Sequence, residues 1–394
     1  MKIAISGAGI AGPTLAHWLL RAGHQPTLIE HSPTLRTGGY VVDFWGVGYT
    51  IAERMGILPK VREAGYIIHE LRCVDEDSRR LGGFMMDTLN IDNGRYITIS
   101  RSQLAALIYE SIAGEVRTIF GDSIASLEEH ETGVRVGLAS GVEREFDLVI
   151  GADGLHSNVR KLVFGPEEPF EKDLGYRVAA FEVNGYTPRD ELIYIIHAST
   201  SHQIARFAVH ENRTLFLFVF RAELAPDADP RTQEEIRSVL HSVFGDMKWE
   251  VPQILQELDS AGDIYYDRVS QIRMDTWHKG RVMLIGDAAA AVSLLAGEGT
   301  GLAMAEAYTL AGELGLAGDD YAKAFDEYEN MLRPFIVEKQ EWAVSFASTF
   351  VPDSEFGLWM RNQSMKLMNL PGIGRLMLGR MMHDNFELKD YFPA

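Results

Sequence analysis

The spacing of apolar residues along the chain predicts alternating strands and helices near its start. An apolar strand is expected over Lys2–Ser6, a helix over Pro13–Ala22 and a second strand over Pro26–Glu30. This order is that of a βαβ unit, in which two parallel strands flank a helix. Residues 101–113 carry apolar side chains at helical spacing and predict a further helix with one buried face.

Two later segments are expected to return to the same sheet. Short apolar strands are predicted over Phe146–Ile150 and Arg281–Ile285, and each leads into a turn that contains glycine and aspartate. Before the first of them, Val116–Phe146 alternates and turns like a small antiparallel meander. The nucleotide-binding fold is therefore expected to be discontinuous.

The middle of the chain has a different character, because its strand-like runs are rich in β-branched and aromatic residues. These runs are Tyr176–Val183, Leu192–His197, Gln203–His210 and Thr214–Phe220. They predict a separate antiparallel sheet inserted into the first fold. After Tyr321 the chain is expected to be helical, with interruptions at Pro334, Pro352 and Pro371.

These patterns predict an α/β fold with a Rossmann-like domain, an inserted antiparallel β-sheet domain and a C-terminal helical segment. We assign residues 1–73, 101–175 and 273–330 to the Rossmann-like domain. Residues 74–100 and 176–272 are assigned to the substrate domain, and residues 331–394 to the C-terminal helices.

Composition narrows the class of protein. The 394 residues carry a formal net charge of -19, which would repel phosphate backbones, so nucleic acid is not the expected partner. Cys73 is the single cysteine, so no intrachain disulfide can form and a reducing compartment fits. The first strand begins at the N-terminus, and no apolar run reaches the roughly 20 residues of a membrane span. We therefore expect a cytoplasmic protein without integral membrane association.

A glycine motif links the first strand to the first helix. Gly7, Gly9 and Gly12 form a Gly-x-Gly-x-x-Gly pattern, with Ile10 and Ala11 in its gap. In such a turn the first glycine allows a tight bend, the second lets the backbone approach a pyrophosphate, and the third permits close packing of helix on strand. Free amides at the helix N-terminus also favour phosphate.

The nature of the nucleotide follows from Glu30 and from two further motifs. Glu30 ends the second strand, where a carboxylate accepts hydrogen bonds from ribose hydroxyls and would repel a 2′-phosphate. The ligand is therefore expected to be FAD or NAD. A plain NAD dehydrogenase has no reason to carry both Gly151–Gly154 and Gly286–Asp287 after strands that point at one ligand.

At these residues the chain resembles the p-hydroxybenzoate hydroxylase-like (class A) flavoprotein monooxygenases. Their three signatures match Gly7–Gly12, Gly151–Arg160 and Gly286–Ala289 in order and spacing over nearly the whole chain. The chain is most similar to compact members such as the tetracycline-inactivating monooxygenases.

The resemblance implies a GR2-type FAD-binding domain. It also implies a monooxygenase that uses NAD(P)H and O2, through a flavin hydroperoxide, to hydroxylate a hydrophobic aromatic, phenolic or polyketide-like small molecule. A second complete glycine fingerprint is absent from the sequence, so NAD(P)H is expected to bind transiently.

The resemblance also assigns roles to four charged residues. Asp287 would hydrogen-bond the ribityl chain of FAD, and Arg101 would reach its ribityl-pyrophosphate region. Arg36 would lie near the adenosine, with a solvated loop charge as the alternative. Asp153 would help to hold the fold and the nicotinamide nucleotide, with a turn or helix-capping residue as the alternative.

A further glycine cluster, Gly297–Gly301, opens the helix expected over Thr300–Leu316. The free amides around Gly297, Gly299, Thr300 and Gly301 can face the flavin pyrimidine edge, where reduced flavin is anionic and a helix N-terminus favours it. The alternative is a flexible turn.

The chain departs from the family pattern just before this cluster. Ala290, Val292 and Leu294 stand where family members usually carry an aromatic residue or histidine and prolines. The departure leaves FAD binding intact and bears on the oxygen step.

The substrate side offers weaker signals. His197, Gln203 and Arg206 are polar residues among apolar neighbours and are candidates for binding substrate oxygens, with a solvent-facing position as the alternative. Phe218 alternates with two other phenylalanines, which predicts either a ligand wall or core packing. No catalytic side chain and no metal site is assigned.

The C-terminal segment from Met360 to Met382 holds six of the 15 methionines. It is expected to form either a lid over the substrate or a packing or dimer contact. A non-oxygenating flavin reductase and a ligand-sequestering flavoprotein remain alternatives to the monooxygenase, and the protein is expected to be a monomer or a homodimer.

Overall fold

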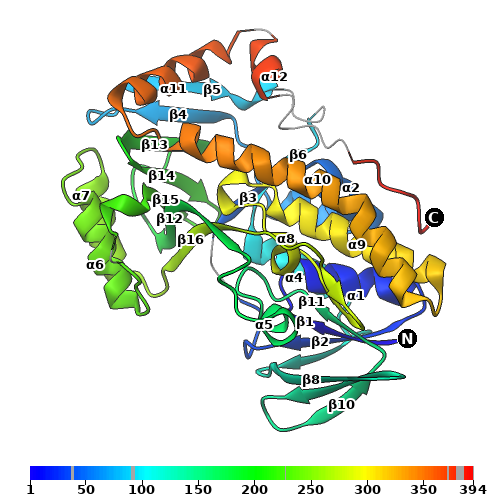
Figure 1. Ribbon diagram of the computed structural model, residues 1–394. Helices are drawn as coiled ribbons and strands as arrows, with labels where there is room; N and C mark the ends of the chain where they lie inside the picture. Colours follow the sequence, from blue (N-terminus) through cyan, green and yellow to red (C-terminus); the bar gives the residue numbers. More distant parts are fainter. Residues whose placement is uncertain (37–39, 90–93, 227, 371, 379–385, 394) are drawn as a thin grey trace.

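A six-stranded sheet forms the centre of the first domain (Figure 1). The computed structural model describes residues 1–36, 40–89, 94–226, 228–370, 372–378 and 386–393. The strand order is β17-β18-β11-β1-β2-β7, and all pairs are parallel except β17 with β18. The strands are β1 (Lys2–Ser6), β2 (Gln25–Glu30), β7 (Arg117–Phe120), β11 (Leu148–Gly151), β17 (His278–Lys279) and β18 (Val282–Leu284).

Both segments that were predicted to return to this sheet, now β11 and β18, join it beside β1 and each other, so the discontinuous fold is confirmed. One expected boundary is wrong: β7 was placed in the antiparallel meander but pairs in parallel with β2. The meander itself consists of β8 (Ile124–His130), β9 (Gly133–Leu138) and β10 (Glu143–Phe146).

Helices cover the parallel sheet, which explains its nearly continuous apolar strands. Helix α9 is buried on all sides because it packs against α1, α2 and α10, so its apolar residues follow no single-face pattern. The helices around the sheet are α1 (Ala11–Arg21), α2 (Gly46–Arg54), α3 (Leu58–Ala64), α4 (Arg101–Glu110), α5 (Asn158–Phe164), α8 (Asp287–Ala290), α9 (Gly299–Ala317) and α10 (Tyr321–Phe350).

The second sheet has seven strands in the order β16-β12-β15-β14-β13-β4-β5. It was expected to be antiparallel, but it is mixed, because β13 and β4 run parallel. Two expected boundaries shift, since β4 starts at Glu70 and β12 at Glu171. The strands are β4 (Glu70–Val74), β5 (Arg80–Met85), β12 (Glu171–Asn184), β13 (Ile193–Ser199), β14 (His202–Val209), β15 (Arg213–Arg221) and β16 (Tyr265–Ile272).

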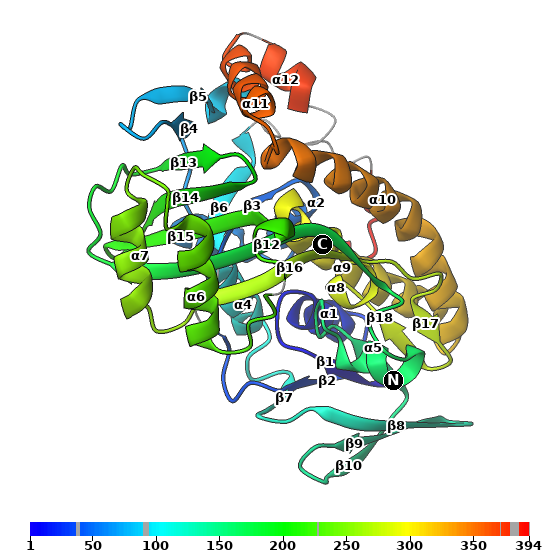
Figure 2. The same cartoon turned by 60° about the vertical axis from the view of Figure 1, so that its left-hand side comes forward.

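The seven-stranded sheet has two different faces. One face is covered by α6 (Gln233–Phe244) and α7 (Val251–Ser260), which lie side by side on it in Figures 1 and 2. The other face points towards the first domain and meets the two-stranded sheet of β3 (Val41–Trp45) and β6 (Tyr96–Ser100). The two domains therefore meet at this second face.

The C-terminal part is helical, as predicted, but one expected interruption is wrong. Pro334 lies inside α10, where buried Leu332, Phe335 and Ile336 hold the helix against the core despite the missing backbone donor. The helix ends at Phe350, just before Pro352, as predicted. Then follow α11 (Glu355–Leu367) and α12 (Ile373–Leu378), while Pro371 lies outside the described residues. None of the described helices is both long and apolar enough to cross a bilayer.

Candidate active site

The three glycine motifs lie at one edge of the parallel sheet. Each follows the carboxyl end of one of three neighbouring strands, β1, β11 and β18. In open α/β sheets, ligands bind outside these strand ends. The motifs, separated by more than a hundred residues in the sequence, therefore meet at one place.

Gly7 and Gly12 are required by packing. Gly7 has a φ of 104°, and a Cβ on it would lie 2.5 Å from the Ala152 carbonyl oxygen of the second motif. A Cβ on Gly12 would lie 2.0 Å from the Gly7 carbonyl oxygen, so only glycine lets α1 approach the loop. Both positions fix the turn from which α1 starts.

Gly9 has space beside it. A Cβ there would meet only a guanidinium nitrogen of Arg101, at 3.9 Å. Ile10 and Ala11 are buried at the start of α1, and no side chain caps the first amides of this helix. An open cradle beside uncapped amides fits a pyrophosphate group.

Glu30 is held at the end of β2, next to the same loop. Its carboxylate accepts hydrogen bonds from the backbone amides of Ala8 (2.8 Å) and Ser32 (2.9 Å). Arg36 lies farther along and is exposed, and its Nε donates to Ser32 Oγ at 3.2 Å. Residues 37–39, which follow it, lie outside the described part of the chain.

Arg101 and Asp287 are the first residues of α4 and α8. The Arg101 guanidinium lies beside Gly9, and the Asp287 carboxyl lies beside Gly299. Burial raises the pKa of the Asp287 carboxyl, and the charge of the nearby Arg101 guanidinium opposes that rise. Within the described part of the chain, neither side chain has a hydrogen-bond partner. A guanidinium donor and a carboxylate acceptor without protein partners fit the polar middle of a dinucleotide.

The Gly297–Gly301 cluster lies against Asp287. A Cβ on Gly299 would be 3.7 Å from Asp287 Oδ1, and Gly297 adopts a left-handed φ of 70° just before the helix. Gly301 allows α9 to cross α2 closely, because a Cβ on Gly48 would lie 2.6 Å from Gly301 Cα. Thr300 is buried in the first turn of α9. The uncapped N-terminus of α9 therefore faces the same region as Asp287.

Two buried glutamates in this region were missed from the sequence. Glu306 accepts hydrogen bonds from the Gly286 amide (2.6 Å) and the Tyr328 hydroxyl (2.9 Å), and burial raises its pKa to about 7. Glu298 pairs with Lys339 of α10 at 2.9 Å. An acidic residue inside a glycine cluster was the only available signal for Glu298, and no local pattern pointed to Lys339.

Asp153 is engaged by the protein itself. Its carboxylate accepts hydrogen bonds from Ser157 Oγ (2.5 Å), the Val159 amide (3.0 Å) and Ser6 Oγ (3.4 Å). These contacts join β1 to the start of α5. Such contacts are those expected if Asp153 is a turn or helix-capping residue, the alternative given for it above.

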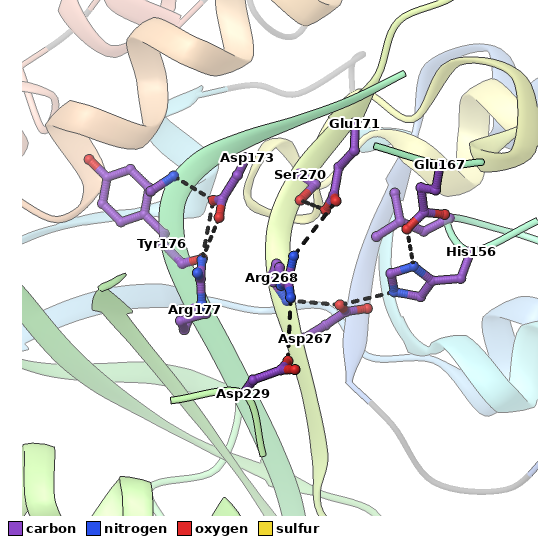
Figure 3. Close-up of polar contacts among 12 residues, drawn as sticks. His156, Glu167, Glu171, Asp173, Tyr176, Arg177, Asp229, Asp267, Arg268 and Ser270 are labelled. Atoms are coloured by element: carbon purple, nitrogen blue, oxygen red, sulfur yellow. Dashed lines mark hydrogen bonds and ion pairs between the residues drawn. The ribbon is translucent and has the colours of Figure 1, made fainter. Parts of the chain in front are cut away.

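A polar network continues from this turn to the second sheet. Figure 3 shows His156 between Glu167 (2.8 Å) and Asp267 (3.3 Å), with Arg268 beside Asp267. The hydrogen bond to Asp267, together with that to Glu167, raises the pKa of His156 to about 9. The network borders a groove of about 320 Å³ lined by His156, Glu167, Glu168, Glu171, Asp229, Pro230, Tyr266, Asp267 and Arg268.

Three of the four candidate substrate residues lie on the helix-covered face of the second sheet. Phe218 packs between Phe181 and Phe244, which is the core packing offered as its alternative. Arg206 pairs with Asp190 (2.6 Å) and Glu250 (3.1 Å).

His197 lies on the same face. Its ring centroid lies 5.5 Å from that of Trp249, and its Nδ1 lies 3.2 Å from the Val74 carbonyl oxygen. The solvent-facing alternative is wrong for His197, Gln203 and Arg206, because all three are buried.

Gln203 alone among the four points towards the first domain. It lies opposite Val219, which packs against α10 and Leu295. Its Oε1 accepts a hydrogen bond from Arg361 of α11 at 2.8 Å. Near it, Ala198, Ala205 and Leu217 keep accessible surface in the middle of the sheet, so space remains over these side chains.

Asp43 was not predicted, yet it joins the two domains where they meet. Its Oδ1 accepts hydrogen bonds from Thr98 (2.5 Å), Tyr96 (3.2 Å) and, across the domain boundary, Tyr194 (3.3 Å). Burial raises the pKa of its carboxyl. Its other oxygen has no hydrogen-bond partner among the described residues.

The positions that depart from the family pattern form an apolar wall. Ala290 and Val292 are buried, and half-buried Leu294 packs into the cluster between α10 and the second sheet. The Val292 carbonyl oxygen accepts a 2.7 Å hydrogen bond from Gln271. The wall is therefore held in place without the prolines.

The fold and the convergent glycine motifs define an FAD-binding oxidoreductase. Residues 1–342 match the family described as FAD binding domain. An uncharacterised protein of Mycobacterium tuberculosis is 38% identical over 350 residues, covering 87% of this chain and 92% of the relative. A flavin-dependent monooxygenase of an unknown prokaryotic organism is 34% identical over 351 residues, covering 89% and 90%. The crystal structure of tetracycline destructase Tet(51) is similar with a TM-score of 0.81 at 31% identity, covering 94% of this chain and 98% of that chain.

The chain belongs to the FAD binding domain family, within the p-hydroxybenzoate hydroxylase-like class of flavin-dependent monooxygenases. The family interpretation drawn from the three motifs is confirmed.

Proposed function

We propose that this monooxygenase uses NAD(P)H and O2 to hydroxylate a hydrophobic, phenolic or polyketide-like small molecule in the cytoplasm, as a monomer or homodimer. When bound, FAD supplies electron transfer from NAD(P)H and the activation of oxygen. The protein then has to hold the cofactor, position the substrate and exclude water.

The residues around the cradle divide the binding of the cofactor. The amides near Gly9 and the N-terminus of α1 would hold the pyrophosphate, and Glu30 would accept the ribose hydroxyls. Arg101 and Asp287 would take the ribityl region, where their lack of partners among the described residues supports the assignment. The N-terminus of α9 would favour negative charge on the flavin pyrimidine edge.

The substrate would lie between Asp43 and the face of the second sheet that points towards the first domain. The partly exposed side chains of Ala198, Ala205 and Leu217 would form the apolar wall of the substrate site on the second sheet. The second carboxylate oxygen of Asp43 would accept a hydrogen bond from a substrate hydroxyl, which is a group that phenols and enols share. We therefore propose that Asp43 orients the substrate hydroxyl. Gln203 lies on the same face of the second sheet and contacts Arg361 of α11.

The single observation that carries the proposal is the pair of Arg101 and Asp287, without partners in the described part of the chain, at the meeting point of three glycine motifs. The test gives purified, FAD-loaded protein NADH or NADPH, with and without phenolic compounds, and follows oxygen uptake and product mass. The expected result is substrate-stimulated NAD(P)H oxidation and a product one oxygen atom heavier.

Other results of the same experiment would replace the proposal. NAD(P)H oxidation without oxygen insertion would indicate a reductase, and the apolar wall of Ala290, Val292 and Leu294 is the feature that this alternative rests on. Flavin that no nicotinamide nucleotide reduces would indicate a ligand-sequestering flavoprotein.

A further inference from the structure

The outward side of α11 is apolar. Phe356, Trp359 and Met360 are 71%, 54% and 48% exposed, and Leu367 is 52% exposed. Their spacing places all four on one side of the helix. A surface helix normally turns its polar side to solvent. In α11, apolar side chains face the solvent instead, while the polar residues Arg361 and Asn362 are buried.

Specific polar contacts fix this orientation. Arg361 on the inner side is buried and donates to Gln203 and to the Phe350 carbonyl oxygen, at 2.8 and 2.9 Å. Asn369, just after the helix, donates to the Gly83 carbonyl oxygen (2.8 Å) and accepts from the Met85 amide (3.0 Å). Because the polar residues are used internally, the helix cannot turn its apolar side inward without breaking these bonds.

Exposed apolar side chains also occur after α11 and on α12. We call the whole set the outer C-terminal face, and it consists of Phe356, Trp359, Met360, Leu367, Leu370, Leu376 and Met377. These are seven of the 15 large apolar side chains that are exposed in the described part of the chain, so they are concentrated and not scattered. Figures 1 and 2 place α11 and α12 at one extremity of the molecule, next to β5, where a flat surface can reach them.

The charge of this segment differs from that of the rest of the chain. The 27 residues from Phe356 to Met382 contain no aspartate or glutamate, although the chain average of 56 in 394 would give about four. The same segment contains four basic residues, Arg361, Lys366, Arg375 and Arg380. Arg361 is buried, whereas Lys366 is exposed on the same helix as the apolar residues. It is therefore both apolar and cationic within a chain of net charge -19.

We propose that the outer C-terminal face docks peripherally on a phospholipid bilayer that contains anionic lipids. Aromatic and aliphatic side chains on one side of a helix enter the interfacial region, and basic residues are attracted to anionic head groups. Trp359 is exposed among these apolar side chains, and tryptophan is favoured at the interface between membrane and water. A second copy of the chain fits less well, since a two-fold contact would set this acid-free, cationic segment against itself. The acidic remainder of the surface restricts the approach to this face.

The test uses the full-length, FAD-bound protein and co-sedimentation with phosphatidylcholine vesicles, with or without phosphatidylglycerol. Binding is expected to be stronger with phosphatidylglycerol and to weaken with added salt. The double substitution Phe356→Ser/Trp359→Ser should lower vesicle binding by roughly tenfold or more. Leu316→Ser, at an exposed position on α9 outside the face, is the matched control and should bind as the native chain does.

Three results would overturn the proposal. The first is failure of the native protein to sediment with either vesicle, and the second is equal binding by the double variant. The third is a concentration-dependent dimer in sedimentation velocity that the double substitution abolishes, without vesicle binding, which would assign the face to a second copy. Since both substituted side chains are exposed, the flavin spectrum and Tm should stay unchanged and exclude misfolding.

Discussion

Lys339 of α10 lies 2.9 Å from the Oε1 of Glu298, the residue that precedes α9 inside the Gly297–Gly301 cluster. Both side chains are less than a tenth exposed. The ion pair joins the 30-residue helix α10 to the helix N-terminus that faces the cofactor region. It also compensates the negative charge of Glu298 beside the N-terminus of α9.

Removal of one side chain of the ion pair should weaken the compensation of the buried charge on the other. Lys339→Met is expected to lower the free energy of unfolding by about 3–5 kcal/mol, whereas the double variant Lys339→Met/Glu298→Gln should recover much of that loss. Urea denaturation of the two single variants and the double variant gives the coupling energy. A coupling energy near zero would show that the pair does not act as a unit.

Substitution of two glycines in the first motif should separate folding from cofactor binding. Gly9→Ala has room for its Cβ and should leave the apoprotein folded, but the methyl group enters the cradle and should weaken FAD binding by about tenfold or more. Gly12→Ala places a Cβ 2.0 Å from a carbonyl oxygen and should prevent folding. Circular dichroism and FAD titration distinguish the two variants. Equal FAD affinity of Gly9→Ala and the native chain would contradict the assignment of the cradle.

Glu306 should give stability a dependence on pH. Its pKa is about 7 in the folded chain, against an ordinary value of 4.5, so the folded protein retains a proton that the unfolded chain releases. Stability should therefore fall by about 3 kcal/mol as pH rises from 4.5 to 7. Glu306→Gln should remove this slope in thermal denaturation, while Glu341→Gln at an exposed position should keep it. An unchanged slope in Glu306→Gln would contradict the prediction.

His156 should make stability depend on pH in a higher range than Glu306 does. Its pKa is raised from 6.5 to about 9, so the stabilising charge is fully present below pH 6.5 and is lost as pH rises through about 9. The side chain is 57% exposed, so solvent screening should limit the effect to less than about 1 kcal/mol. Comparison of the Tm of His156→Gln and the native chain at pH values below 6.5 and above 9 measures it. The difference between the two proteins should be present only at the lower pH.

Asp43→Asn tests the proposed orientation of the substrate hydroxyl. The substitution keeps the size of the side chain but removes a charged acceptor, which should cost about 1.5–3 kcal/mol and raise KM for a phenolic substrate roughly tenfold or more. The affinity for FAD should stay the same. A substrate analogue without the hydroxyl is the control, because its binding should not respond to the substitution. Equal losses for both ligands would assign Asp43 a structural role only.

The nucleotide-binding part could be predicted because its signals are local. Gly7, Gly9 and Gly12 lie within one turn, and their roles follow from backbone geometry that a short segment determines by itself. The strands that carry the second and third motifs were also recognisable, because strands buried on both faces are continuously apolar. Their parallel return to one sheet brings the motifs together.

Only the tertiary structure decided which face of each strand or helix lies towards the proposed substrate site. Alternation along β14 separates Gln203 from Arg206 and places them on opposite faces, but it does not say which face α6 and α7 cover. The contacts of Asp43 with Tyr194 and of Glu298 with Lys339 join residues that are 151 and 41 positions apart, so no local pattern could reveal them. Sequence determined the motifs, because backbone conformation is local. Packing determined the partners of the buried charges, because the cost of burying a charge depends on what the rest of the chain places beside it.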